Sequence, residues 1–292
     1  MRIETSISEA IRRIAGDGIS ITHSMKISGG DINEASMLIL SNGRRVFLKS
    51  NKTKGIDFFE AEAQGLSAIF DTNTIAVPEV LGIGNDPNAG TFLILNYIEN
   101  SKKADDYWIV FAEELGAMHK ADTTKYVIDG EYGFLADNYI GSREQINTPY
   151  DSWIEFFRDC RLSPRFEGAN SYFDSQMIRS INRLLDNLDK WLIEPERPSL
   201  LHGDLWSGNA ITGSNGKAWL IDPAVYVGFG CVLDTMEKLL LMVVYGIMTV
   251  YTMSTDLKRQ KNSFASIKEI IYWQTYNYKP KRHMILYSGP AL

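Results

Sequence analysis

The stretch Leu200–Thr212, LLHGDLWSGNAIT, joins two short apolar runs through a loop of polar residues and glycines. Within this loop Asp204 is followed five residues later by Asn209. A loop that returns within five residues can place a carboxylate and an amide beside the same reacting group. The carboxylate can then orient and deprotonate a hydroxyl, while the amide oxygen helps to hold a metal ion. An ordinary turn, in which both side chains only cap backbone groups, would have the same spacing, so the surrounding sequence must decide.

Asp222 favours a catalytic loop over an ordinary turn. It follows the apolar run 218–221, thirteen residues after Asn209, at the position expected for a second metal ligand. An Asp-x-x-x-x-Asn loop with a strand-end Asp behind it is the arrangement of kinases. Hard oxygen ligands such as Asn209 and Asp222 favour Mg²⁺ over a thiophilic metal. In protein kinases this Asp begins an Asp-Phe-Gly motif, whereas here Pro223 and Ala224 follow it. We therefore predict phosphoryl transfer from Mg-ATP.

A nucleotide site is predicted in the first third of the chain. Lys49 lies in the apolar run VFLKSN and could pair with nucleotide phosphates, aligned by a carboxylate of the acidic stretch FFEAEAQGL. Glu62 is the first candidate for that carboxylate and Glu60 the second. Upstream, Gly29 and Gly30 in the stretch SGGDIN could let backbone amides approach phosphate oxygens. A hairpin turn would explain these two glycines equally well.

Periodicity divides the chain into a β-rich front and a helical back. Apolar spacing predicts a helix over 6–15, strands over 37–40 and 46–49 around the Asn42-Gly43 turn, a helix over 58–70, and strands over 77–84 and 91–99. Trp108, Phe111, Leu115 and Met118 form one helical stripe, and a second long helix is predicted from Met177 to Trp191. We therefore expect an α+β fold, with a nucleotide-binding N-lobe over 1–99 and a mainly helical C-lobe over 100–292 that holds the catalytic loop and the acceptor site.

Composition narrows the class of partner. The 292 residues carry a net charge of −6, with 45% hydrophobic and 23% charged residues, which argues against binding to nucleic acid or an anionic membrane. The longest apolar stretch, Lys238–Met253, is too short and interrupted to span a bilayer. With only Cys160 and Cys231 and no signal-peptide pattern, we expect a reducing compartment, the cytoplasm. A P-loop, a GxSxG elbow and an HExxH helix are all missing from the sequence.

The motifs LLHGDLWSGN and IDPAVY resemble the fructosamine kinase (ketosamine-3-kinase) family, which is related to aminoglycoside and choline kinases. The segments SGGDINEA, VFLKSN, FEAEAQGL, VPEVLGIG, LGAMHK and YGFLADNYIGSREQINTPYDSWIEFFRDCRL also resemble that family, in the same order, so the resemblance runs from about residue 6 to residue 228. It implies a protein-kinase-like fold. It also implies phosphorylation of the 3-hydroxyl of a ketosamine, a sugar attached to an amine, such as glycated lysine.

The resemblance also implies roles for single residues. Asp204 would be the catalytic base, Asn209 and Asp222 would hold Mg²⁺, and Lys49 with Glu62 would position the phosphates of ATP. The segment 96–99, with Asn96, Tyr97 and Ile98, would be the hinge beside the adenine. On the acceptor side, Trp206 would form a wall for the sugar, although a packed loop aromatic is an alternative. His202 is placed beside the substrate as well, and is a better candidate for bracing the loop than for the base.

The last part of the sequence departs from the family pattern. Family members continue after DPAVYYG with a His-Arg-Glu-x-Asp stretch, whereas here Val227–Asp234 reads VGFGCVLD. Sharp divergence and a shift of the reading frame after about Gly228 both explain this departure. Two other functions therefore stay open: a kinase of another hydroxylated metabolite, such as an aminoglycoside or amino alcohol, and a pseudokinase that binds nucleotide without catalysis. The sequence indicates no oligomeric state.

Overall fold

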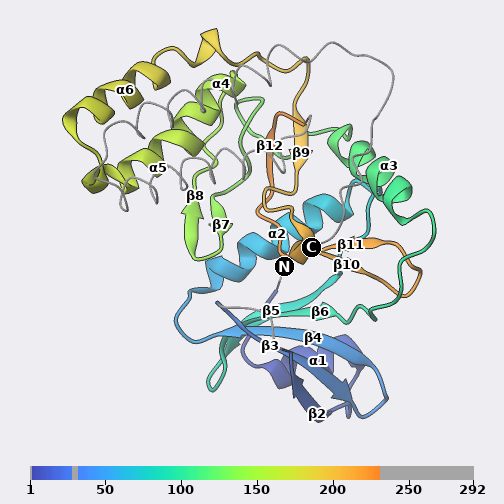
Figure 1. Ribbon diagram of the computed structural model, residues 1–292. Helices are drawn as coiled ribbons and strands as arrows, with labels where there is room; N and C mark the ends of the chain where they lie inside the picture. The colour runs from blue at the N-terminus through green and yellow to red at the C-terminus, as the bar shows by residue number, and fades with distance from the viewer. Residues whose placement is uncertain (1, 28–31, 231–292) are drawn as a thin grey trace, which may run out of the picture.

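The computed structural model describes residues 2–27 and 32–230 (Figure 1). A twisted sheet forms the lower half of the view in Figure 1, and the helices α4, α5 and α6 lie in the upper half. Most of the segment 229–292, which departs from the family pattern, and the predicted glycine turn at Gly29 and Gly30 lie outside the described residues. Within the described residues, no helix is long and apolar enough to cross a membrane.

The N-lobe is built on a six-stranded sheet with the strand order β1-β5-β6-β4-β3-β2. Only β1 and β5 pair in parallel, and the other neighbours are antiparallel. The Asn42-Gly43 turn joins β3 to β4 as predicted, with Gly43 at a φ of +82°. The strands are β1 (Ile3–Glu4), β2 (Ile21–Lys26), β3 (Glu34–Leu40), β4 (Arg45–Asn51), β5 (Val80–Asp86) and β6 (Gly90–Asn96).

The two faces of this sheet pack against different helices. Helix α1 (Ile7–Ala15), capped by the Ser6 hydroxyl, covers one face with Ala10 and Ile11. Helix α2 (Ile56–Phe70) lies against the other face and belongs to the larger core. Because side chains alternate along a strand, Val46 and Leu48 of β4 pack with α1, and Lys49 points to the opposite face. Alternation therefore directs Lys49 toward the rest of the molecule.

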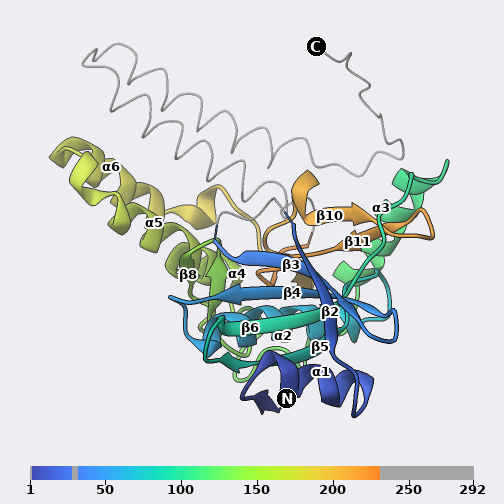
Figure 2. The same ribbon diagram turned by 90° about the horizontal axis from the view of Figure 1, so that it is seen from below.

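The C-lobe consists of helices, turns and three short strand pairs, seen from a second direction in Figure 2. Strand β9 pairs with β12, β10 with β11, and β7 with β8, all antiparallel. A π-helix, η1, continues α4 without a break. The elements are α3 (Tyr107–His119), β7 (Asn138–Ile140), β8 (Arg143–Gln145), α4 (Trp153–Phe156), η1 (Phe157–Leu162), α5 (Ser163–Gly168), η2 (Asn170–Tyr172), α6 (Ser175–Leu185), η3 (Leu188–Lys190), β9 (Ser199–Leu201), η4 (Ser207–Asn209), β10 (Ala210–Thr212), β11 (Ala218–Leu220) and β12 (Tyr226–Gly228).

Two helix predictions need correction. The second long helix ends at Leu185 instead of reaching Trp191, because Asn187 has a non-helical backbone and its side-chain amide donates to the Arg183 carbonyl at 2.8 Å. In the first helix, Met118 is buried as predicted, but Trp108 is 64% exposed and Tyr107 is buried in its place. The Lys103 ammonium lies 4.1 Å from the centre of the Trp108 ring, which stabilises the exposed indole.

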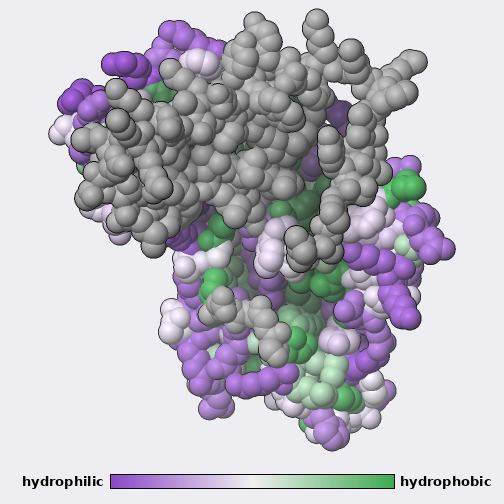
Figure 3. Space-filling view, viewed as in Figure 1, coloured by the Kyte–Doolittle hydropathy of each residue, from purple (hydrophilic) through white to green (hydrophobic). Residues whose placement is uncertain are grey.

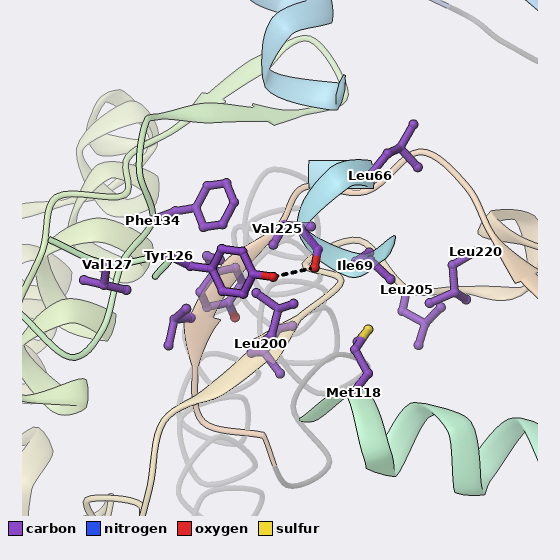
Figure 4. Close-up of a cluster of buried hydrophobic side chains, with 14 of the residues drawn as sticks. Leu66, Ile69, Met118, Tyr126, Val127, Phe134, Leu200, Leu205, Leu220 and Val225 are labelled. Atoms are coloured by element: carbon purple, nitrogen blue, oxygen red, sulfur yellow. Dashed lines mark hydrogen bonds between the residues drawn. The ribbon is translucent and has the colours of Figure 1, made fainter. Parts of the chain in front are cut away.

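One hydrophobic core joins the two lobes. Figure 4 shows side chains of α2, among them Leu66 and Ile69, beside Met118 of α3 and Leu200 of β9. Within this cluster the Tyr126 hydroxyl donates to the Ala68 carbonyl of α2 at 2.8 Å. Helix α2 is therefore packed against both the N-lobe sheet and the C-lobe. The boundary predicted at residue 99 stays a prediction, which the end of the sheet at Asn96 supports.

Candidate active site

The loop that follows β9 is held by a fully buried histidine. The ring of His202 accepts at Nδ1 from the Asp204 backbone N–H at 3.3 Å. Since Nδ1 accepts, Nε2 carries the proton and donates to the Ile221 carbonyl at 3.0 Å. His202 thus ties the Asp204 loop to the residue before Asp222. Its complete burial favours the bracing role and does not support the predicted place beside the substrate.

Asn209 orients Asp204. Its side-chain nitrogen Nδ2 donates to the Asp204 backbone carbonyl at 2.8 Å and to the carboxylate oxygen Oδ2 at 2.9 Å. The Asn209 side-chain oxygen is therefore the atom that can serve as a metal ligand. The Asn209 backbone carbonyl accepts from the Ile221 N–H at 3.0 Å, which brings this loop alongside the residue before Asp222.

Asp222 adopts a backbone conformation that few residues other than glycine accept. Its φ is +55°, in the left-handed region, where Asp is one of the better tolerated side chains. Asp222 lies two residues after the end of β11, and its side chain is 46% exposed. One of its oxygens accepts a hydrogen bond from the Lys49 ammonium. The residue predicted to hold a metal ion and the lysine predicted to bind phosphates, which come from opposite lobes, are thus in contact.

Lys49 and Glu62 form a buried ion pair. Nζ of Lys49 lies 2.6 Å from Oε1 of Glu62, and the two side chains are 8% and 11% exposed. Burial works against the ammonium charge, but attraction to Glu62 and Asp222 outweighs it and raises the pKa of Lys49 above its ordinary value. Burial, with Asp222 adding to it, raises the pKa of Glu62, while Lys49 opposes the shift. Of the two candidate carboxylates, the structure brings Glu62 to Lys49.

The sheet face that carries Lys49 is apolar beside it. In the strand register Ala35 stands opposite Lys49, Met37 opposite Phe47, and Met25 opposite Met37. Cross-strand partners share a face, and Met25 is 55% exposed. Figure 3 shows apolar residues gathered on the N-lobe over β2, β3 and β4. This surface suits the flat ring of a base, and sequence analysis missed it because the register between strands was not known.

The predicted hinge follows β6. Asn96 accepts from the Glu79 backbone N–H at 2.6 Å. The Arg45 guanidinium lies 5.3 Å from the centre of the Tyr97 ring and binds both oxygens of Glu99, at 2.9 and 2.6 Å. Ile98 is partly buried. The segment is therefore fastened to Arg45 of β4 and to Glu79, the residue before β5. In this position it can form one edge of a nucleotide site.

The residues after the hinge also contact the β10–β11 hairpin. After the hinge, the Ser101 N–H donates to the Thr212 carbonyl at 3.0 Å and the Ala104 N–H donates to the Gly216 carbonyl at 3.1 Å. Thr212 ends β10, the strand that begins directly after Asn209. The segment that joins the lobes is thus paired with the hairpin that follows the catalytic loop.

Near the glycine turn, the side chain of Asn51 at the end of β4 holds the residues after that turn. Its Nδ2 donates to the Ile32 carbonyl and to Asn33 Oδ1, both at 2.9 Å. Its Oδ1 accepts from the Thr53 backbone N–H at 2.9 Å. Sequence analysis did not single out Asn51. The two contacts tie the end of the predicted phosphate loop to the strand that carries Lys49.

Trp206 is 55% exposed and is therefore not a buried core aromatic. Its indole lies against Gly208, where a Cβ would stand 2.4 Å from the ring. The exposed ring surface, two residues after Asp204, is available to a ligand, and its contact with substrate stays a prediction.

The residues present fit a magnesium ion that is bound together with phosphates. The described residues contain no group of three or more His, Cys, Asp or Glu side chains that could hold a metal alone. Asn209 and Asp222 offer an amide oxygen and a carboxylate. Mg²⁺ is commonly held by one or two protein oxygens, with phosphate oxygens and water completing its shell. This donor set is suited to a metal that arrives with a nucleotide.

Gly203 gives a direct test of the loop geometry. Its φ is +77°, and a Cβ would stand 1.9 Å from the Ala224 carbonyl oxygen. Gly203→Ala is therefore expected to lower the free energy of unfolding by more than about 1 kcal/mol, measured by urea denaturation. Gly116→Ala in α3 is the matched control, because its Cβ meets nothing within 4 Å, and it should stabilise the protein slightly. Equal stability of both variants would contradict the geometry.

Comparison with known proteins gives a family match. The family described as fructosamine kinase matches residues 3–240. A chloroplastic protein-ribulosamine 3-kinase of Oryza sativa subsp. japonica is 39% identical over 216 residues, which cover 73% of this chain and 61% of the rice protein. The chain thus spans less than two thirds of the length of this relative.

Solved structures agree in fold. A fructosamine-3-kinase structure from Haemophilus somnus 129PT superposes with a TM-score of 0.67 at 25% identity, covering 92% of this chain and 96% of the other. A thermostable aminoglycoside phosphotransferase mutant, in a ternary complex with AMP-PNP and hygromycin B, gives a TM-score of 0.54 at 19% identity, covering 91% and 83%. The predicted α+β, bilobal, kinase-like fold is confirmed.

Proposed function

Because the chain belongs to the fructosamine kinase family, we propose that it transfers the γ-phosphoryl group of ATP to the 3-hydroxyl of a ketosamine. The proposed acceptor is a ribulosamine or a fructosamine, for example on glycated lysine. The rice relative is named for action on protein-bound ribulosamine, and AMP-PNP is the nucleotide bound by the aminoglycoside phosphotransferase. Both support the proposal by similarity.

One observation carries the proposal: Lys49 of the N-lobe meets Asp222 of the C-lobe, next to the Asp204–Asn209 pair. In the proposed reaction, Lys49 binds nucleotide phosphate oxygens, and Glu62 keeps its ammonium in place. Asn209 and Asp222 would hold Mg²⁺, which neutralises charge that develops on the phosphates. Asp204, oriented by Asn209, would accept the proton of the attacking hydroxyl.

The base must be oriented toward the acceptor hydroxyl, and it must not be the group that is engaged by the phosphate-binding lysine. Asn209 supplies a neutral hydrogen bond to the Asp204 carboxylate at 2.9 Å, and the Lys49 ammonium is already engaged by Glu62 and Asp222. The Asp222 carboxylate is therefore engaged by the Lys49 ammonium, whereas the Asp204 carboxylate is oriented by the side-chain amide of Asn209. These contacts support Asp204, and not Asp222, as the base.

A panel of acceptors tests the function. Fructosyl-lysine, ribulosyl-lysine and an aminoglycoside are each incubated with Mg-ATP, and ADP release and the position of the new phosphate are followed, the latter by NMR. We expect 3-phosphorylated ketosamine. Transfer only to the aminoglycoside would favour a kinase of another metabolite. Nucleotide binding without transfer to any acceptor would favour a pseudokinase.

Trp206→Ala tests the proposed sugar wall. Loss of the exposed indole should raise the KM for the ketosamine about two- to tenfold, since aromatic contacts contribute about 0.5–1.5 kcal/mol beyond burial, and should leave the KM for ATP unchanged. Trp108→Ala is the control, because Trp108 is also exposed but lies on α3. Steady-state kinetics with both substrates varied decide the matter. A wild-type KM for the ketosamine in Trp206→Ala would remove Trp206 from the acceptor site.

The location in the cytoplasm and the absence of a nucleic-acid partner stay predictions. The rice relative is described as chloroplastic.

A further inference from the structure

The β7–β8 hairpin carries two buried carboxamides that the proposed reaction does not use. Asn138 and Gln145 stand opposite each other in the strand register and are 3% and 1% exposed. Gln145 Nε2 donates to Asn138 Oδ1 at 2.7 Å. Buried amides are costly unless they are hydrogen-bonded, so the partners of this pair indicate what it does.

Both side chains donate to backbone carbonyls two and three residues after Asp222. Gln145 Nε2 also donates to the Ala224 carbonyl at 3.0 Å, and Asn138 Nδ2 donates to the Val225 carbonyl at 2.6 Å. The orientation of the Gln145 amide follows from chemistry, because a backbone carbonyl can only accept and must face the nitrogen. Gln145 Oε1 is buried without a partner among the described residues. The contribution of Gln145 therefore comes from Nε2.

The same short segment is held from its other side by the catalytic loop. The Ala224 N–H donates to the His202 carbonyl at 2.9 Å. Ala224 is thus fastened through its N–H to the loop that carries Asp204 and through its carbonyl to Gln145. Two residues earlier, Asp222 sits at a φ of +55°. A non-glycine residue stays in this region only when its surroundings hold it there, and these contacts hold the segment that follows it.

We infer that Asn138 and Gln145 are positioning residues for Asp222, which act through the backbone of Ala224 and Val225 and set the direction of the metal-binding carboxylate. The inference rests on the proposed function, since it assigns Asp222 to Mg²⁺. Side chains that orient a metal ligand typically change metal affinity or activity 10- to 100-fold when they are replaced.

The hairpin also contacts the lobe that binds nucleotide. The Tyr139 hydroxyl donates to Asp57 Oδ2 at 2.7 Å, and its ring lies 4.9 Å from that of Phe58, centre to centre. Asp57 and Phe58 begin α2, the helix that carries Glu62. Figure 1 shows β7 and β8 beside the end of α2. The hairpin therefore links the helix that aligns Lys49 to the loop that aligns Asp222.

The test measures metal-dependent nucleotide binding, which needs no turnover. Gln145→Glu keeps the shape but turns an acceptor oxygen toward Asn138 Oδ1 and the Ala224 carbonyl, which removes both hydrogen bonds. Calorimetry gives the affinity for ADP without metal and with Mg²⁺. We expect the gain in affinity due to Mg²⁺ to fall about tenfold in the variant, with the metal-free affinity within about twofold of the wild type. The kcat with Mg-ATP should fall in parallel.

The control is Tyr126→Phe, which removes another buried hydrogen bond, to the Ala68 carbonyl of α2, and leaves the hydrogen bonds to Ala224 and Val225 in place. It should lower the melting temperature and leave the Mg²⁺ gain unchanged. If Gln145→Glu does not fold, the same gain in ADP affinity due to Mg²⁺ is measured for Gln145→Met, which removes the donors without adding a charge. A wild-type Mg²⁺ gain in the folded Gln145 variant would overturn the inference. If the wild-type protein bound ADP with the same affinity with and without Mg²⁺, the proposed function would be overturned instead.

Discussion

Replacing Asp204 with asparagine is expected to lower kcat for ketosamine phosphorylation about 10³-fold and to leave nucleotide affinity within about twofold. A general base typically contributes 10²- to 10⁴-fold, and an amide cannot take the proton of the hydroxyl. The fold should tolerate the change, because the Asp204 backbone carbonyl and N–H keep their contacts with Asn209 and His202. Rapid-quench or steady-state kinetics, together with calorimetry of ADP binding, measure both quantities.

Asp122→Asn is the matched control for this experiment. Asp122 lies in an exposed C-lobe turn and accepts from the Thr124 N–H at 3.0 Å, a bond that asparagine can keep. The kcat of the Asp122→Asn variant should equal that of the wild type. Turnover by Asp204→Asn near the wild-type rate would falsify the assignment of the base, and the proton would have to leave to another group or to water.

Replacing Lys49 with methionine is expected to abolish detectable turnover and to destabilise the protein. The change leaves Glu62 buried without its cation, and breaking a buried pair by removing one partner typically costs about 3–5 kcal/mol. It also removes the proposed contact to the nucleotide phosphates, so the affinity for Mg-ATP should fall. Urea denaturation measures the stability and calorimetry measures the affinity.

A double variant separates the two effects of this change. Lys49→Met/Glu62→Gln has no buried uncompensated charge at this pair, so it should recover much of the stability and none of the activity. Lys125→Met is the control, since Lys125 pairs with Asp71 at 2.9 Å on the surface and exposed pairs contribute little. If Lys49→Met were as stable as the wild type and still turned over, the Lys49–Glu62 pair would be neither structural nor catalytic.

The charge of Lys49 is expected to persist over the whole range in which the enzyme could act. Its pKa is raised by Glu62 and Asp222 against the effect of burial, so the stabilisation from the ammonium is present below the ordinary lysine pKa. It is lost only as the pH rises through the elevated value. A fall of activity between pH 6 and 9 should therefore not be attributed to Lys49.

Much of the architecture could be predicted because it depends on neighbours in the chain. Two β-rich runs around the Asn42-Gly43 pair were enough to predict β3 and β4, and apolar residues at helical spacing were enough to predict α1. The helix predicted over 177–191 is too long because of a local contact: the Asn187 amide, bonded to the Arg183 carbonyl, ends α6 early. Such side-chain caps compete with helix periodicity, and a stripe of apolar residues does not reveal them.

The order of Asp204, Asn209 and Asp222 along the chain was enough, by itself, to indicate a phosphoryl-transfer site, because a short loop limits where the first two side chains can lie. Which carboxylate pairs with Lys49 was decided only by tertiary structure. Glu60 and Glu62 lie two positions apart, on different sides of a helix, and only the packing of α2 shows that Glu62 faces the lysine.

The most distant contacts depended entirely on the tertiary structure. Lys49 and Asp222 are 173 residues apart, and Gln145 reaches Ala224 across 79 residues. Spacing and periodicity report what a residue's neighbours in the chain impose, so they were enough to propose the reacting groups. They contain no information on how two lobes pack, and that packing is what brings Lys49, Asp222 and the backbone contacts of Gln145 together.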